Sequence, residues 1–343
     1  MKNTKKKMNF RGLTDAQCAG QRLMVGFDGT GMNADLKYLI QELHVGGIIL
    51  FSRNISTPGQ VRELCVSIQD QARACGEPPL FVAIDQEGGI VARLKDPFTE
   101  FPGNPHMTGI ADAVEFAEIT AEELSEHGIN MNMAPVLDVA FDPDKSIMAD
   151  RAFGADPEWV STLGTAVVAN LQKRGVMSVA KHFPGIGRTT LDSHLDLPFL
   201  DTDPALFAST DLLPFAAAIE QGAAGLMLSH ICYRRMDDTW PASLSGTIAR
   251  DLLREKMGYH GVVMTDDLDM GAIRNHYDMG TVMQRILTAE VDVALICHRS
   301  RNIEDAFEFI LAFQAASDSN REVCERSVKR ILRAKNAYLR KGP

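Results

Sequence analysis

Eight short apolar runs recur along the chain, and the segment between one run and the next is long enough to form a helix. The runs are residues 23–27, 47–51, 81–85, 130–139, 176–183, 224–230, 261–267 and 291–297. They are apolar on both faces of the pleat, which is typical of a parallel sheet covered on both sides. Segments such as 60–76 and 157–175 have the apolar spacing of helices that would supply this cover. Eight such units close most naturally into a (β/α)8 barrel, so the sequence predicts an α/β protein with this fold.

An open, doubly wound sheet is the alternative arrangement for the same units. Residues 27–33, which follow the first run, lack the complete glycine pattern of a phosphate-binding turn, and no acidic residue ends the second run. The barrel is therefore favoured. Because no linker rich in Pro, Gly or Ser divides the chain, we expect residues 1–343 to form one domain, with residues 1–10 as a flexible tail. Residues 323–341 have the pattern of a closing amphipathic helix.

The balance of charge argues against a nucleic-acid partner. The 343 residues include 35 Lys and Arg against 45 Asp and Glu, a formal net charge of −10, and the one dense basic run is Lys5–Lys7. No apolar stretch is long enough to span a bilayer, and the basic N-terminus is not followed by the apolar core of an export signal. The six cysteines have neither paired nor metal-binding spacing. We therefore expect a cytoplasmic protein without a membrane partner.

Reactive side chains stand at the ends of most of the predicted strands. In a (β/α)8 barrel these ends meet at one rim, which is where the chemistry takes place. The residues are Asp28, Asp85, Asp138, Lys181, His182, His230, Asp266, Asp267 and His298. A single Asp at a strand end can instead cap the next helix, and this interpretation stays open for Asp28, Asp138 and Asp267. Their convergence on one rim indicates an active site for a polar, hydroxyl-rich or carbonyl substrate.

The segment 180–198 is denser in such residues than helix capping requires. A strand ends in Lys181 and His182, and a loop rich in Gly and Pro then carries Asp192 and His194. A carboxylate two residues from an imidazole can hydrogen-bond one ring nitrogen, fix the tautomer and raise the pKa of the other nitrogen. This is a general acid/base unit. The alternative is that Asp192 caps a turn and His194 is solvated.

A second dense segment, 252–272, reads as a helix, a glycine turn and a buried strand that ends in Asp266 and Asp267. A carboxylate held at the end of a rigid strand suits a nucleophile that must approach one carbon along one line. Only one of Asp266, Asp267 and Asp269 can point straight into the barrel. Asp267 and Asp269 could instead hold the following turn.

Several motifs together resemble a known family. They are GQRLMVGFDGT, VGGIILFSRNI, AIDQEGGIVARL, NMNMAPVLDV followed by DRAFG, KHFPGIGRTTLDSH, GLMLSH with PASLS, and GVVMTDDLDMGA. The chain resembles the family 3 glycoside hydrolases, and within them the single-domain bacterial β-N-acetylglucosaminidases (β-N-acetylhexosaminidases) of peptidoglycan recycling. The combination of KHFPGxG and DSH is typical of that branch, whereas the β-glucosidases carry their acid/base residue on an additional domain.

The resemblance implies a role for each matching residue. Asp266 would be the nucleophile, and His194, polarised by Asp192, would be the acid/base. The residues implied in binding the terminal sugar are Asp85, Arg93, Arg151, Lys181, His182 and, more weakly, His230. No residue suggests a metal or another cofactor, and the implied partner is a small glycan.

The chain departs from the family pattern at two positions. Many members have Arg where this chain has Ile90, and often His where it has Ile186. Because Ile186 lies in the loop but outside the Asp-His pair, we expect it to alter loop closure or leaving-group preference rather than abolish the chemistry. Ile90 is expected to change how neighbouring side chains are oriented.

The implied reaction is retaining, exo-acting hydrolysis of terminal β-linked N-acetylglucosamine through a glycosyl-enzyme. A β-N-acetylglucosaminide phosphorylase is an alternative, because a neutral histidine repels phosphate less than a carboxylate would. A non-catalytic sugar-binding barrel is another. A metal-dependent hydrolase would normally carry His-x-His at the first strand, and this chain has Phe-Asp-Gly there. The natural glycan, whether muropeptide, chitin fragment or glycoprotein glycan, is left open.

Overall fold

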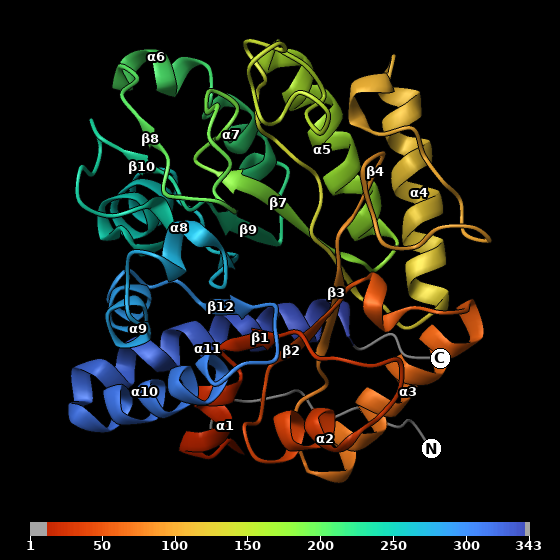
Figure 1. The fold of residues 1–343 in the computed structure, drawn as a ribbon, viewed down its shortest axis with the longest axis vertical. Helices are drawn as coiled ribbons and strands as arrows, with labels where there is room; N and C mark the ends of the chain where they lie inside the picture. Colours follow the sequence, from red (N-terminus) through yellow and green to blue (C-terminus); the bar gives the residue numbers. More distant parts are fainter. Residues whose placement is uncertain (1–11, 340–343) are drawn as a thin grey trace.

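Eight parallel strands form a closed barrel in the computed structural model, which describes residues 12–339 (Figure 1). In pairing order they are β1 (Leu23–Val25), β2 (Gly47–Leu50), β3 (Phe81–Ile84), β6 (Met131–Asn132), β7 (Met177–Phe183), β9 (Gly225–Leu228), β11 (Val262–Asp267) and β12 (Val293–Ile296), and β12 pairs with β1. The predicted (β/α)8 barrel is confirmed. The expected tail, residues 1–10, lies outside the described residues.

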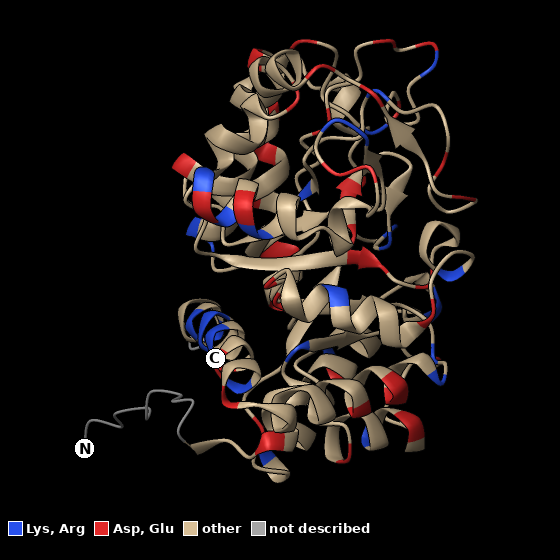
Figure 2. Ribbon diagram, turned by 90° about the vertical axis from the view of Figure 1, so that its left-hand side faces the viewer, with Lys and Arg blue, Asp and Glu red and all other residues tan. Residues whose placement is uncertain are grey.

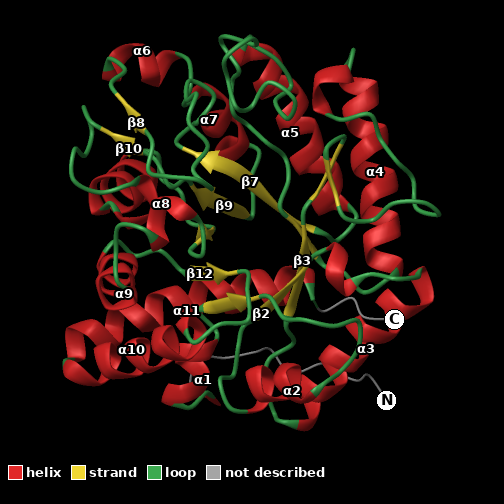
Figure 3. Ribbon diagram, viewed as in Figure 1, coloured by secondary structure: helices red, strands yellow, loops and turns green. Residues whose placement is uncertain are grey.

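Helices surround the strands (Figure 3). They are α1 (Asp15–Gly20), α2 (Ala34–Gln41), α3 (Pro58–Ala74), α4 (Ile110–Glu126), α5 (Pro157–Lys173), α6 (Pro204–Ser209), α7 (Leu213–Glu220), α8 (Gly271–Arg274), α9 (Met279–Thr288), α10 (Asn302–Ala316), α11 (Asp318–Tyr338), the π-helix η5 (Thr247–Lys256) and the 3-10 turns η2 (Ser52–Asn54), η3 (Asn104–His106) and η4 (Ala242–Leu244). Two small sheets pair β4 (Gln86–Gly88) with β5 (Val91–Ala92), and β8 (Phe199–Leu200) with β10 (Cys232–Tyr233).

The apolar character of both strand faces is explained by two separate cores. Alternate residues of the strands fill the barrel interior as one buried cluster, which includes Met24, Ile49, Phe81, Ala83, Met131, Met177, Val179, Met264 and Leu295. The other strand residues pack outward against the helices in a second, larger cluster. Because side chains alternate along a strand, each core receives every second residue.

The same alternation of side chains along the strands places three charged residues at the predicted site. Asp85, Lys181 and Asp266 each stand two residues beyond a residue of the inner core, namely Ala83, Val179 and Met264. The C-terminal ends of β3, β7 and β11 therefore deliver these three charged side chains to the mouth of the barrel.

Irregular pairing at two of these strand ends allows more than one side chain per strand to reach the mouth. On β7 the chain takes three residues from Ala180 to Phe183, while β9 takes two from Leu226 to Leu228. The pairing of β11 with β12 shifts in the same way after Met264. Strand β11 takes three residues from Met264 to Asp267, whereas β12 takes two from Val293 to Leu295. Such bulges bend a strand and re-aim its side chains, and they are common next to active sites.

The predicted strand over 130–139 is too long. Only Met131–Asn132 pair as strand β6, and the chain returns to β7 through a single bridge between Val136 and Lys181. Pro135 interrupts the ladder because it has no N–H to donate. Its carbonyl still accepts from the backbone N–H of Lys181 at 3.0 Å, so the irregular segment stays attached to the barrel.

The interpretation of three strand-end aspartates as helix caps is wrong. Helices α2, α5 and α8 have Asn33, Asp156 and Met270 at their N-cap positions. Asp28, Asp138 and Asp267 stand before these helices without capping them. Asp138 and Asp267 instead make contacts at the barrel mouth, described below.

Helix α11 closes the N-terminal end of the barrel, as predicted for the amphipathic C-terminal segment. Ile331 joins the inner core from this side. Lys335 is fully buried, and its Nζ donates to Gln21 Oε1 at 2.6 Å and to the carbonyl of Gly46 at 2.7 Å, just before β1 and β2. The helix carries a concentration of basic residues (Figure 2).

Within residues 12–339, no helix combines the length and the apolar character needed to cross a membrane. The six cysteines are free thiols, five of them buried. The buried cysteines pack in the protein interior as small apolar residues.

Lys335 predicts a pH-dependent stability. Burial lowers its pKa from 10.5 to about 7, so between these values the unfolded chain binds more protons than the folded one. Burial of Lys335 therefore lowers the free energy of unfolding at pH 7, and this destabilisation becomes smaller as the pH rises. We expect the free energy of unfolding of the wild type, relative to Lys335→Met, to increase by about 2 kcal/mol between pH 7 and pH 9. Urea denaturation of both proteins at both values measures this difference, and an unchanged difference would contradict it.

Candidate active site

A buried lysine at the end of β7 lies between two carboxylates. Lys181 Nζ is 2.7 Å from Asp85 Oδ1 and 2.6 Å from Glu87 Oε1. Asp85 follows β3 directly, and Glu87 lies in β4 two residues later. The lysine therefore ties the β3 and β7 ends of the barrel together across its mouth.

Two arginines complete this group of charges. Arg151, from the segment between β6 and α5, makes a two-pronged contact with Glu87 at 2.8 and 3.0 Å. Arg93, just after β5, reaches Asp85 Oδ2 through Nη2 at 3.3 Å. Each carboxylate is thus shared by Lys181 and one arginine, which fixes the orientation of all five side chains.

The mutual charges keep these groups ionised despite their burial. For Asp85, burial would raise the pKa, but Lys181 and Arg93 outweigh it and hold the pKa at about 2. For Lys181, burial would lower the pKa, but the two carboxylates raise it above its ordinary value. The site therefore presents fixed charges and hydrogen-bonding groups at neutral pH.

His182 is oriented by Asp138. Its Nδ1 lies 2.7 Å from Asp138 Oδ2, and because a carboxylate only accepts, the proton lies on Nδ1. Its Nε2 faces Arg151 Nη2 at 3.5 Å. Asp138 also accepts from the backbone N–H of Ile186 at 2.8 Å, so the same carboxylate anchors the start of the loop that follows β7.

Asp266, at the end of β11, is an ionised carboxylate beside two imidazoles. Burial would raise its pKa, but His182 and the amide of Asp267 lower it below the ordinary value. In the neighbouring Asp267, burial dominates and raises the pKa to about 6. Asp267 Oδ1 accepts from the amides of Asp269 and Cys297, both at 3.0 Å, and so holds the turn after β11.

His230 lies next to Asp266 with both ring nitrogens engaged by the protein. Nε2 donates to the carbonyl of Asp267 at 2.9 Å, and Nδ1 lies 2.7 Å from Ser243 Oγ. Burial lowers its pKa, which favours the neutral ring. In this arrangement His230 supports the end of β11, and no ring nitrogen is left to meet a sugar hydroxyl.

Asp192 and His194 form the predicted pair on the loop between β7 and β8. Asp192 Oδ1 accepts from His194 Nδ1 at 2.7 Å and from the His194 backbone N–H at 2.9 Å. The side chains are 47% and 66% exposed, so His194 Nε2 is accessible from outside. Burial would raise the pKa of Asp192, but its hydrogen bonds to His194 and the charge of Arg151 lower it. Asp192 is therefore within electrostatic range of the central group.

Comparison with known proteins identifies the family of this chain. Residues 16–334 match the family described as the glycosyl hydrolase family 3 N-terminal domain. The chain belongs to this family. The match spans all eight barrel strands and every site residue described above.

Three relatives illustrate the similarity. A β-hexosaminidase A of Pseudoalteromonas piscicida is 34% identical over 94% of this chain and 61% of its own length. A family 3 β-N-acetylglucosaminidase from Paenibacillus sp. str. FPU-7 is 38% identical with a TM-score of 0.92, over 96% of this chain and 64% of that one. NagZ from Neisseria gonorrhoeae, solved with N-trifluoroacetyl-D-glucosamine, is 30% identical with a TM-score of 0.75, over 84% of each chain. This chain thus spans less than two thirds of the first two proteins.

Two residues to which the family resemblance gave no role, Glu87 and Asp138, also contact the site. Glu87 could have been found from its spacing, because it follows Asp85 by two residues in DQEGG and so can share its direction. Asp138 was expected at the rim of the barrel, with a helix cap as the open alternative. Its contact with His182 arises from two distant strand ends, a juxtaposition that no local pattern in the sequence indicates.

The two positions that depart from the family pattern have different surroundings. Ile186 is buried, with 4% of its surface exposed, and its backbone is bound to Asp138. Ile90, between β4 and β5, is 69% exposed. Their expected effects on loop closure and side-chain orientation stay predictions.

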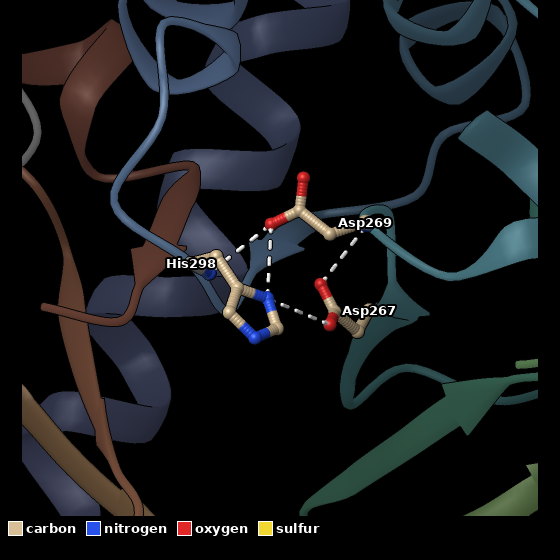
Figure 4. Close-up of side chains that lie close together, drawn as sticks. All are labelled: Asp267, Asp269 and His298. Atoms are coloured by element: carbon tan, nitrogen blue, oxygen red, sulfur yellow. Dashed lines mark hydrogen bonds and ion pairs between the residues drawn. The ribbon is translucent and has the colours of Figure 1, made fainter. Parts of the chain in front are cut away.

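A cluster of Asp267, Asp269 and His298 lies at the end of strand β11 (Figure 4). His298 Nδ1 is 3.9 Å from Asp267 Oδ2 and 3.5 Å from Asp269 Oδ2. Asp269 also accepts from the backbone N–H of His298 and from Asn302 Nδ2. These contacts bind the turn after β11 to the segment after β12, in agreement with the structural interpretation of Asp267 and Asp269.

Glu87 generates a prediction about stability. Glu87→Gln removes a buried negative charge on which Lys181 and Arg151 both depend, leaving two cations incompletely paired. We expect the free energy of unfolding to fall by about 3 to 5 kcal/mol, as for other buried pairs that lose one partner. Asp305→Asn, at an exposed pair with Arg301, is the control and should cost less than about 1 kcal/mol. Urea denaturation measures both, and similar losses would contradict the central role of Glu87.

Proposed function

We propose that this family 3 chain is a retaining, exo-acting β-N-acetylglucosaminidase that hydrolyses terminal β-linked N-acetylglucosamine. The observation that carries the proposal is Asp266, an ionised carboxylate held at a strand end inside a ring of charged hydrogen-bonding groups. An Asp-His pair on the neighbouring loop supplies the second reactive group. Relatives named β-hexosaminidase and β-N-acetylglucosaminidase support the substrate class.

The central charges are suited to binding the hydroxyls of one sugar. Arg93 Nε is buried and makes no hydrogen bond within the described residues, so it is an unused donor at the barrel mouth. Asp85 has acceptor capacity beside it. A site whose buried polar groups are completed by substrate hydroxyls discriminates strongly against analogues that lack them. We assign Asp85, Arg93, Arg151, Lys181 and His182 to this task.

In the first step, an Asp266 carboxylate oxygen attacks the anomeric carbon of the sugar. The bond from that carbon to the glycosidic oxygen breaks, and His194 Nε2 donates its proton to the departing oxygen. The products are a glycosyl ester on Asp266, the alcohol of the leaving group and a neutral His194. Because Asp192 holds the proton on Nδ1, Nε2 is the nitrogen that exchanges protons.

In the second step, His194 Nε2 takes a proton from water, whose oxygen attacks the anomeric carbon. The ester bond to Asp266 breaks, and its carboxylate is restored. Two inversions at one carbon retain the β configuration of the product. The position of Asp266 at the end of strand β11 fixes the direction of attack in the first step.

For the natural substrate, we propose cell-wall muropeptides, processed in the cytoplasm during peptidoglycan recycling, without a nucleic-acid or membrane partner. The gonococcal NagZ complex with N-trifluoroacetyl-D-glucosamine supports a glucosamine amide as the bound sugar. The net charge of −10 opposes binding to nucleic acid.

The proposal predicts different losses for the two reactive groups. Asp266→Ala should lower kcat/KM for every aryl β-N-acetylglucosaminide by about 10⁴-fold or more, because no glycosyl ester can form. His194→Ala should lose about 10²- to 10⁴-fold on substrates with poor leaving groups and far less on activated ones, which need no proton. Steady-state kinetics with a series of leaving groups measures both effects.

His260→Ala is the control, because His260 is exposed just before β11, at the opposite end of the barrel, and should leave the rates unchanged. Near-normal cleavage by Asp266→Ala would rule out Asp266 as the nucleophile. Equal losses by His194→Ala on activated and unactivated substrates would remove His194 as the acid.

Product analysis tests the reaction type. With aryl β-N-acetylglucosaminide the β-anomer of the free sugar should appear first in the NMR spectrum, and aryl β-glucoside should react much more slowly. Product formation independent of inorganic phosphate is expected. A sugar phosphate formed only when phosphate is present would establish the phosphorylase alternative, and binding without turnover would establish a sugar-binding barrel.

A further inference from the structure

The Asp-His loop carries its reactive side chains on a segment without regular secondary structure. Between the end of β7 at Phe183 and the start of β8 at Phe199 the chain forms no helix or strand. His194 is largely exposed, and the next residue, Leu195, is 69% exposed. Side-chain packing therefore contributes little to the position of His194, and other contacts must hold the loop.

Backbone hydrogen bonds from α8 supply that contact. The N–H of Gly271 donates to the carbonyl of His194 at 3.1 Å, and the N–H of Ala272 donates to the carbonyl of Ser193 at 3.0 Å. Helix α8 has no side-chain cap, and amides in the first turn of a helix have no partner within it. The loop carbonyls satisfy these amides, so α8 lies directly against the Asp-His loop (Figure 1).

Gly271 permits this close approach. A Cβ at this position would lie 2.5 Å from the carbonyl oxygen of Leu195 and 2.6 Å from that of His194. Both are backbone atoms, which cannot rotate away as a side-chain end could. Any residue larger than glycine would therefore push the loop away from α8.

Side chains at the end of α8 extend the contact. Asn275 Nδ2 donates to the carbonyl of Leu195 at 3.2 Å, and His276 Nε2 lies within hydrogen-bonding distance of Asp196 Oδ1. Each residue from Ser193 to Asp196 thus accepts or shares a hydrogen bond with the segment 271–276.

The same helix is tied to the nucleophile. Only four residues separate Asp266 from Gly271, and the turn between them is closed by Asp267, whose Oδ1 binds the amide of Asp269 and whose carbonyl binds the amide of Met270. Asp266, the turn, α8 and the Asp-His loop therefore form one continuous hydrogen-bonded unit.

We propose that residues 271–276, the α8 latch, position His194 relative to Asp266, with Gly271, Asn275 and His276 as positioning residues. This inference rests on the proposed role of His194 as acid/base. A displacement of about 1 Å in a catalytic group can cost about 10²-fold in rate, so the latch sets the efficiency of proton transfer without touching the substrate.

Gly271→Ala tests the latch by kinetics on two leaving groups. For an alkyl β-N-acetylglucosaminide, which needs a proton on its leaving oxygen, kcat/KM should fall by about 100-fold. For the dinitrophenyl glycoside, which needs none, kcat/KM should stay within about threefold of the wild type. The sugar-binding charges lie elsewhere, so the KM for the alkyl substrate should change little.

Matched variants separate the latch from a folding defect. Gly59→Ala, in α3 with open space around the added methyl group, should leave both rates unchanged. Asn275→Ala and Asp196→Ala leave the backbone contacts intact and should each lower only the alkyl rate, by about 3- to 10-fold. These two variants keep the test decisive if Gly271→Ala does not fold, as judged by circular dichroism.

The outcomes distinguish the latch from the acid/base assignment. Leaving-group dependence in Gly271→Ala or in the two side-chain variants, parallel to that of His194→Ala, supports the latch. Equal losses on both substrates, or wild-type rates in all three variants, overturn it while leaving His194 as the acid. If His194→Ala itself shows no leaving-group dependence, the acid/base role fails and the latch fails with it.

Discussion

The contact of Lys181 with Asp85 and Glu87 is the interaction on which the site depends. Taking three charges out of water is costly, and only close contacts of opposite sign offset that cost. Arg93 and Arg151 complete the compensation. The network therefore fixes the geometry of the barrel mouth rather than adding stability for its own sake, and its rigidity would let the proposed sugar substrate meet groups that need no rearrangement.

Two adjacent carboxylates at the end of β11 show how position decides chemistry. His182 and the amide of Asp267 outweigh the burial of Asp266 and keep it ionised. Asp267 faces amides and the neighbouring acids, and burial raises its pKa to about 6. One residue of difference along a strand thus separates the proposed nucleophile from a residue that holds the turn, because the barrel interior receives alternate side chains.

The two reactive groups sit on supports of different kinds. Asp266 ends a strand in the core, whereas His194 is carried by an exposed loop that rests on α8. A loop can approach and leave a substrate while a strand cannot, which suits the proposed role of His194 first as acid and then as base. The latch confines that freedom to a narrow range.

The barrel, its eight strand positions and the charged residues at its mouth could be predicted from the sequence, because continuous apolar runs and the reactive residues at their ends are local patterns. Only tertiary structure decided the rest. Pro135 shortened β6 through the missing N–H, and Glu87 and Asp138 became site residues through partners on other strands. Glycine is required at position 271 because the backbone of a loop almost 80 residues earlier lies too close for a Cβ. Periodicity specifies which way a side chain points, but which partner it meets depends on the closure of the barrel, since that brings distant strand ends together.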